Sequence, residues 1–162
     1  MINILYVYAL FFAFFCSTVS SAPTSRATPS DIEALITELT SESNAASSML
    51  GAFPSTGGSL LQALAIHTAL SNLNQGFQSG TTDVLSLPMP ISDADATAII
   101  NQVNSQLTPA LGSLFAGIMK FPNDSTLGGV PALVKQDGAT LSASVQGFYN
   151  VLGIATPVMP GS

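Results

Sequence analysis

Apolar side chains recur at three- and four-residue steps in five segments of this chain, and this period constrains its fold most. Because 3.6 residues make one helical turn, such spacing places the apolar side chains along one face of an α-helix. Proline and glycine separate the segments, and no stretch alternates as a half-buried strand does. We therefore expect an all-α fold, a single-domain bundle of about five amphipathic helices. The segments cover about residues 32–53, 59–77, 92–107, 108–121 and 131–152.

Polar residues mark where several of these helices are expected to begin. Ser30 and Glu33 have the spacing of a capping box, in which each side chain hydrogen-bonds the backbone of the other residue. The second helix is expected to start near Ser59. Thr108 followed by Pro109 has the form of a cap with proline at the first helical position, which predicts a separate fourth helix.

Glycines mark the expected interruptions. Gly80 and the apolar, proline-broken residues 83–91 are predicted to form a loop. Gly138 and Gly147 lie inside the last segment, where a glycine costs about 1 kcal/mol relative to alanine. We expect these two glycines to mark a bend or a close approach between helices.

An apolar run near the start of the chain has the length of a secretory signal. Residues 4–16 are apolar without a break, which is shorter than the about 20 residues of a membrane span. Val19 and Ser21 then occupy the third and first positions before a cleavage site at Ala22. We expect a signal peptide over residues 1–21, cleaved near Ser21/Ala22, and a secreted protein of the extracellular space or cell wall. An uncleaved anchor is the alternative.

The rest of the chain is expected to form one domain. Residues 22–29 are predicted as a flexible linker, residues 30–156 as the helical bundle and residues 157–162 as a C-terminal tail. This tail lacks the hydrophobic stretch of a glycolipid anchor. Cys16, the one cysteine of the chain, lies in the predicted signal. The mature protein is therefore expected to have no disulfide and to be stabilised by a packed core.

Charge and ligand chemistry exclude several classes of function. The chain has 9 acidic and 3 basic residues and a formal charge of −6, so it lacks the clustered cations of a nucleic-acid binder. One histidine and no mature cysteine cannot form a structural zinc centre. Asp93 and Asp95 follow Ser92 as helix-capping acids, without the central glycine and closing glutamate of a calcium loop. We expect a non-catalytic protein with no metal and no cofactor.

Two polar residues lie within apolar stripes, His67 in the second segment and Asp137 in the last. Each could be a satisfied core group, with His67 donating to a backbone carbonyl and Asp137 bound to a helix end or a hydroxyl. Alternatively the two side chains face each other, or His67 meets the polar head of a ligand inside the bundle. A serine that met them in space, without any sequence motif, would make a lipid-cleaving enzyme.

Two runs of sequence resemble a known family. GGSLLQALAIHTALSNL at residues 57–73 and ISDADATAIINQVNSQLTPAL at residues 91–111 are similar to the fungal hydrophobic surface-binding protein A family, which also includes cell-wall galactomannoproteins. The resemblance implies a secreted helical bundle that adsorbs to hydrophobic surfaces, and related mannoproteins hold fatty acids inside the bundle. Residues 130–152 fit the family only loosely. This chain also has only Lys120 and Lys135 where the family carries more lysine.

Two functions follow from the sequence and the resemblance. In the first, the protein binds hydrophobic surfaces, or long-chain lipids such as fatty acids, without catalysis. Surface adsorption would use exposed apolar residues such as those at 84–91. In the second, the protein is a structural cell-wall mannoprotein that contacts wall polymers or another secreted protein, such as a hydrolase. Asn123 begins the sequon for N-glycosylation.

A lipid channel between the helices would be lined by the apolar stripes, with His67 at its polar end. The same apolar positions would serve equally well as ordinary core. The predicted ligand-binding residues are Leu35, Leu39, Leu64, His67, Phe115, Ile118, Leu141 and Phe148.

Overall fold

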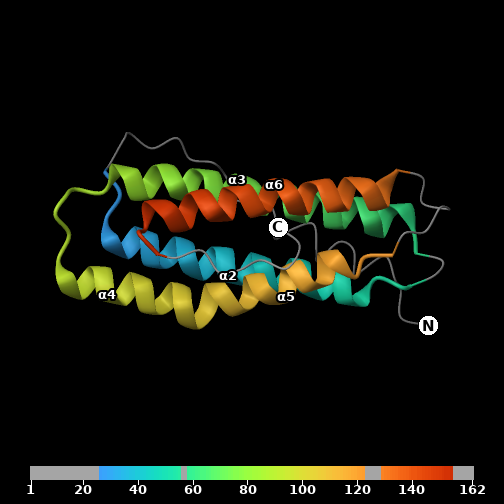
Figure 1. Cartoon of the computed structure of the whole chain (residues 1–162), viewed down its shortest axis with the longest axis horizontal. Coiled ribbons are helices and arrows are strands. Elements are labelled where there is room, and N and C mark those ends of the chain that lie inside the picture. The colour runs from blue at the N-terminus through green and yellow to red at the C-terminus, as the bar shows by residue number, and fades with distance from the viewer. Residues whose placement is uncertain (1–25, 56–57, 123–128, 155–162) are drawn as a thin grey trace, which may run out of the picture.

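The computed structural model describes residues 26–55, 58–122 and 129–154, and within these ranges the chain is all-α (Figure 1). The expected single-domain α-helical bundle is confirmed, with four long helical stretches among the described residues. The predicted signal peptide, the glycosylation site at Asn123 and the C-terminal tail lie outside the described residues. The stretches are α2 Pro29–Ala52, α3 Leu60–Ser86, α4 Asp93–Gln102 with the π-helical turn η1 Val103–Leu107 and α5 Thr108–Met119, and α6 Val130–Val151.

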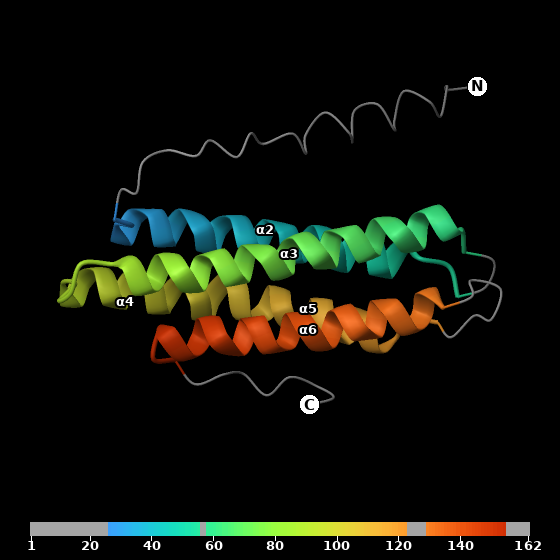
Figure 2. The same cartoon turned by 90° about the horizontal axis from the view of Figure 1, so that it is seen from above.

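Successive stretches run in opposite directions and pack in two layers. The helices α3 and α6 lie side by side in one layer, and α2 lies beside the continuous α4–α5 stretch in the other (Figures 1 and 2). The layers meet where α2 contacts α3 and where α5 contacts α6. None of the described helices combines the length and the hydropathy needed to cross a membrane. We refer below to the α3/α6 layer and the α2/α4–α5 layer.

The first helix begins with a different capping box from the predicted one. Thr28 is the N-cap, its hydroxyl accepts from the Asp31 backbone, and the Asp31 carboxylate accepts from the Thr28 backbone at 2.8 Å. The prediction of a capping box at Ser30 and Glu33 is therefore wrong. Pro29 explains the shift, because a proline fits the first helical position, where a backbone N–H would have no partner. The hydrogen bonds from Thr28 favour the charged carboxylate and lower the pKa of Asp31.

The second helix starts where the sequence predicts but ends later. Ser59 and Gln62 form its capping box, and α3 then continues through Gly80 to Ser86, so the prediction of a loop beginning at Gly80 is wrong. Gly80 is buried, and a Cβ there would lie 2.6 Å from Leu35 Cδ2 and 3.1 Å from Phe148 Cε2. The glycine thus lets α2 and α6 approach α3 closely instead of ending it.

The third and fourth predicted helices form one continuous stretch. Ser92 caps α4 as predicted, accepting from the backbone of Asp95. Thr108 is not a cap, because its backbone is helical and its N–H donates to the Val103 carbonyl five residues earlier. Pro109 has no N–H and would interrupt an ordinary helix interior. The wider π-helical turn carries the helix past this proline, so four stretches replace the expected five.

The core lies between the two layers and contains large aromatic side chains. Phe77 of α3 meets Phe148 of α6 edge to face, with ring centroids 5.6 Å apart. The rings of Phe53 and Phe121 pack at a tilt of 40°, with centroids 4.7 Å apart, where the chain leaves α2 and α5. Tyr149 is fully buried, its hydroxyl lies 2.8 Å from the Thr108 hydroxyl, and burial raises the pKa of its phenol. This hydrogen bond joins the two layers across the seam between α5 and α6.

Only one of the two glycines noted in α6 lies at a close helix approach. A Cβ at Gly138 would lie 2.8 Å from Ile118 Cγ2 of α5, whereas a Cβ at Gly147 would meet nothing within 4 Å. The expectation of a close approach is therefore confirmed at Gly138. At Gly147 the structure shows no contact that requires glycine.

Candidate functional site

Most of the predicted channel-lining residues lie in the packed core. Leu39, Phe115, Ile118, Leu141 and Phe148 are each exposed by 5% or less. Leu35 is half-buried and packs against the same core cluster. Leu64 differs from the rest, because it is 41% exposed on the outside of α3. The structure thus gathers six of these side chains in one core and places Leu64 on the surface.

No predicted lining residue borders either of two hollows that lie on the surface of the described residues. One is an apolar pocket of about 150 Å³ between the end of α2 and the start of α3, bordered by Met49, Phe53, Ala65 and Ile66 among others. The other is a larger polar groove between α2 and α4. The role of the predicted residues in holding a ligand stays a prediction.

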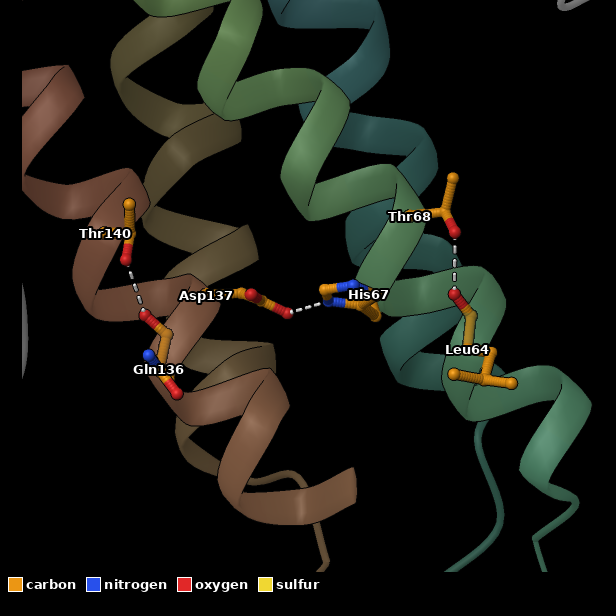
Figure 3. A network of polar contacts seen from close by, with 6 residues as sticks. All are labelled: Leu64, His67, Thr68, Gln136, Asp137 and Thr140. Atoms are coloured by element: carbon orange, nitrogen blue, oxygen red, sulfur yellow. Dashed lines mark hydrogen bonds and ion pairs between the residues drawn. The ribbon is translucent and has the colours of Figure 1, made fainter. Parts of the chain in front are cut away.

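His67 and Asp137 face each other between α3 and α6. The His67 Nδ1 atom lies 2.6 Å from the Asp137 Oδ2 atom (Figure 3). Because an ionised carboxylate only accepts hydrogen bonds, the imidazole donates through Nδ1. The two side chains are 34% and 16% exposed, so the pair lies at the edge of the layer. Of the alternatives considered for these residues, the mutual contact is the one that the structure shows.

The hydroxyl groups nearest in sequence to this pair are used within their own helices. Thr68 donates to the Leu64 carbonyl at 3.0 Å and Thr140 donates to the Gln136 carbonyl at 3.1 Å (Figure 3). Neither is hydrogen-bonded to the imidazole, so neither is arranged as an activated nucleophile. Among the described residues, no group of three His, Cys, Asp or Glu side chains is placed to hold a metal ion.

An exposed apolar patch lies on the first turns of α3. Leu60, Leu61 and Leu64 are 54%, 68% and 41% exposed, and we call these three residues the leucine patch. They occupy the arc of α3 that faces away from its buried residues Ile66 and Leu70. Each leucine therefore exposes apolar surface at this end of the bundle, beside the apolar pocket.

The sequence held a signal for this patch that the prediction did not use. The three leucines fall on the opposite side of α3 from the long stripe of buried residues. A helix that packs by one face must expose the other. Leu64 was instead assigned to the interior of the bundle, and that position is corrected by its exposure.

A second exposed apolar segment lies at the opposite end of the bundle, where residues 84–91 were predicted to be exposed. Leu85 and Met89 are 70% and 80% exposed, whereas Leu87 is buried. The prediction therefore holds for two of the large side chains of this segment. Leu87 packs into the core and anchors the connection between α3 and α4.

Charged side chains are distributed unevenly between the two layers. In α3, residues 60–82 contain no Asp, Glu, Lys or Arg, and α6 contains only Lys135 and the paired Asp137. The α2/α4–α5 layer instead carries a row of carboxylates. Burial and the neighbouring Glu38 raise the pKa of one of them, Glu42. These carboxylates are Asp31, Glu33, Glu38, Glu42, Asp93 and Asp95.

Comparison with known proteins places the chain in a family. No curated protein and no solved structure matches it. The family model described as hydrophobic surface binding protein A matches residues 29–153, a range that begins at the first residue of α2 and ends just after α6. The family name supports binding to hydrophobic surfaces, in agreement with the leucine patch. This chain therefore belongs to the hydrophobic surface binding protein A family.

Proposed function

We propose that the protein is secreted and adsorbs, without catalysis, to hydrophobic surfaces through the leucine patch and the uncharged outer face of α3. The exposure of Leu60, Leu61 and Leu64 carries the proposal. Along the same helix, residues 60–82 add no charge that would have to lose its water on contact with an apolar solid. The acidic α2/α4–α5 layer then faces the solvent and keeps the adsorbed protein hydrated.

The leucine patch can supply a useful part of the adsorption energy. Fully covering an exposed leucine is worth about 1.5–3 kcal/mol, and each of the three is about half exposed. The patch therefore contributes roughly 3 kcal/mol, a factor of about 100 in the partition constant. This contribution needs no opening of the bundle.

The test measures adsorption isotherms on polystyrene beads for Leu60→Ser, Leu61→Ser and the double variant. We expect the double variant to bind at least tenfold more weakly with unchanged helix content, because both side chains are solvent-exposed. Met119→Ser is the matched control, since Met119 is 57% exposed but lies at the end of α5 in the α2/α4–α5 layer. Equal loss in the control and in the patch variants would contradict the role of the patch.

We further propose fatty acids as soluble ligands of the same protein. The apolar pocket supports this proposal, because its volume of about 150 Å³ and its side chains Met49, Phe53 and Ile66 suit the end of a hydrocarbon chain. Displacement of a fluorescent fatty acid from delipidated protein tests it. Saturable binding at a fixed stoichiometry would support the carrier function, and its absence would leave surface adsorption alone.

A structural role in the cell wall is the second candidate function. The observation that favours it is the hydroxyl- and amide-rich exterior of the described helices, which suits contact with wall polymers or with a secreted hydrolase. Fractionation of a culture tests the location. Recovery of the protein in the medium and wall fractions supports the proposed secretion, whereas recovery inside the cell would contradict it.

A further inference from the structure

An open polar groove of about 600 Å³ runs along the surface between α2 and the α4–η1 stretch. The groove is wide open to solvent, so it suits an extended ligand lying along the surface rather than a small molecule enclosed in a cavity. Hydroxyl, amide and carboxylate side chains border it, and the only apolar side chains among the bordering residues are two alanines. The adsorption proposed above uses the opposite layer and leaves this groove free.

Several residues that border the groove are held by hydrogen bonds. The Gln102 side-chain amide donates to the Glu33 carbonyl at 3.0 Å and to the Thr37 hydroxyl at 2.8 Å. The Ser105 hydroxyl donates to the Asn101 carbonyl at 2.7 Å. The two bonds from Gln102 fix α4 against α2 before any ligand arrives, whereas the Ser105 bond lies within the α4–η1 stretch.

Other polar groups at the groove remain available to a ligand. Among the described residues, the side-chain amides of Asn101 and Gln106 take part in no hydrogen bond, and both residues are exposed. The Glu33 carboxylate borders the same space. Two amides and one carboxylate supply both donors and acceptors along the wall of the groove.

The π-helical turn shapes this wall. Ser105 and Gln106 belong to η1 and border the groove. Such turns insert an extra residue into a helix and occur frequently at functional sites. Here the turn changes the helix next to the side-chain amides of Asn101 and Gln106. It is an observation separate from the residue composition of the groove.

The chemistry of the bordering residues selects the ligand class. They include no Lys, Arg or His to hold a phosphate, and a single carboxylate is too few for a divalent cation. They include no aromatic or large apolar side chain to hold an acyl chain. Amides and a carboxylate facing water instead suit the adjacent hydroxyl groups of a neutral sugar. We propose that this groove binds a segment of a neutral polysaccharide.

Because no aromatic ring is among the bordering residues, we expect a low affinity for each sugar unit. A single sugar binds weakly here, and useful retention comes from many protein molecules on one polymer or one surface. A protein that also adsorbs to apolar surfaces by the α3/α6 layer would then join a hydrophobic material to a carbohydrate one. The groove itself requires no such adsorption.

The test is co-sedimentation of the purified protein with insoluble β-1,3-glucan, chitin and mannan. We expect retention on at least one of them, and an Asn101→Ala/Gln106→Ala double variant should bind it about tenfold more weakly, since two hydrogen bonds are lost. The matched control is Gln75→Ala/Gln146→Ala, which removes two exposed amides from the α3/α6 layer.

Two outcomes would overturn the proposal: retention on none of the three polymers, or equal loss of binding in the groove variant and the control. Adsorption to polystyrene is measured on the same samples and should be unchanged in the groove variant. A failure of the groove proposal is therefore distinguishable from a failure of the adsorption proposal.

Discussion

Replacing Gly138 by alanine tests the packing of α6 against α5. An alanine Cβ would lie 2.8 Å from Ile118 Cγ2 and 3.3 Å from Ile118 Cδ1, whereas an ordinary carbon contact is about 3.5–4.0 Å. The Cγ2 atom is attached directly to the Cβ of a buried β-branched residue and has little room to move. The substitution must therefore push the two helices apart or force Ile118 out of its rotamer.

Gly147→Ala in the same helix provides the reference. Both substitutions gain about 1 kcal/mol of helix propensity, but a Cβ at Gly147 meets nothing. Overpacking costs typically 1–3 kcal/mol. We therefore expect Gly147→Ala to stabilise the protein by up to about 1 kcal/mol and Gly138→Ala to be about 1–3 kcal/mol less stable than Gly147→Ala.

Urea denaturation measures both free energies of unfolding, and equal slopes would show that the comparison is valid. Adding Ile118→Leu to Gly138→Ala removes the branched methyl at nearly constant volume and should recover part of the loss. If Gly138→Ala stabilises the protein as much as Gly147→Ala, α6 does not pack against α5 as described.

Three further predictions concern polar groups. Burial and the neighbouring Glu38 raise the pKa of Glu42 in the folded protein. Ionising Glu42 therefore destabilises the folded protein, and this cost vanishes below the unfolded pKa, where Glu42 is protonated in both states. Glu42→Gln should therefore be more stable than the parent at neutral pH and equal to it near pH 3, as denaturation at both pH values will show; a pH-independent difference would be inconsistent with this origin. Tyr149→Phe should lower the free energy of unfolding by about 0.5–1.5 kcal/mol through loss of the Thr108 hydrogen bond, and a Thr108→Val/Tyr149→Phe variant that loses the sum of both single effects would argue against that bond. His67→Leu leaves the mostly buried carboxylate of Asp137 without its partner, so thermal melts should show it less stable than His67→Leu/Asp137→Leu; the reverse order would mean that the pair is not formed.

The fold follows from the sequence because helical periodicity is a local property. Each apolar stripe specifies the buried face of its own helix, and the starts at Ser59 and Ser92 follow from side chains within one turn. The misplaced capping box reflects the local effect of Pro29, whereas the loop predicted at Gly80 is wrong because tertiary packing changes the role of that residue. Gly80 resembles a chain break in the sequence, but Leu35 and Phe148 pack against it inside a helix.

The candidate sites were less accessible to sequence analysis than the fold. His67 and Asp137 were recognised as unusual because each interrupts an apolar stripe, yet their contact depends on the register of α3 against α6. The polar groove was not predicted, since its residues come from α2, α4 and the π-helical turn Val103–Leu107. Ordinary polar residues give no local signal when only their arrangement across helices makes the site.

The uneven distribution of charge between the layers also limits how densely the protein can cover a surface. Molecules that adsorb by the α3/α6 layer present their carboxylates upward and sideways to their neighbours, and the whole chain carries a formal charge of −6. Their mutual repulsion extends over about 8 Å at physiological ionic strength and over less in concentrated salt. A film of this protein should therefore become denser as salt is added, even though each single contact with the surface is apolar and insensitive to salt.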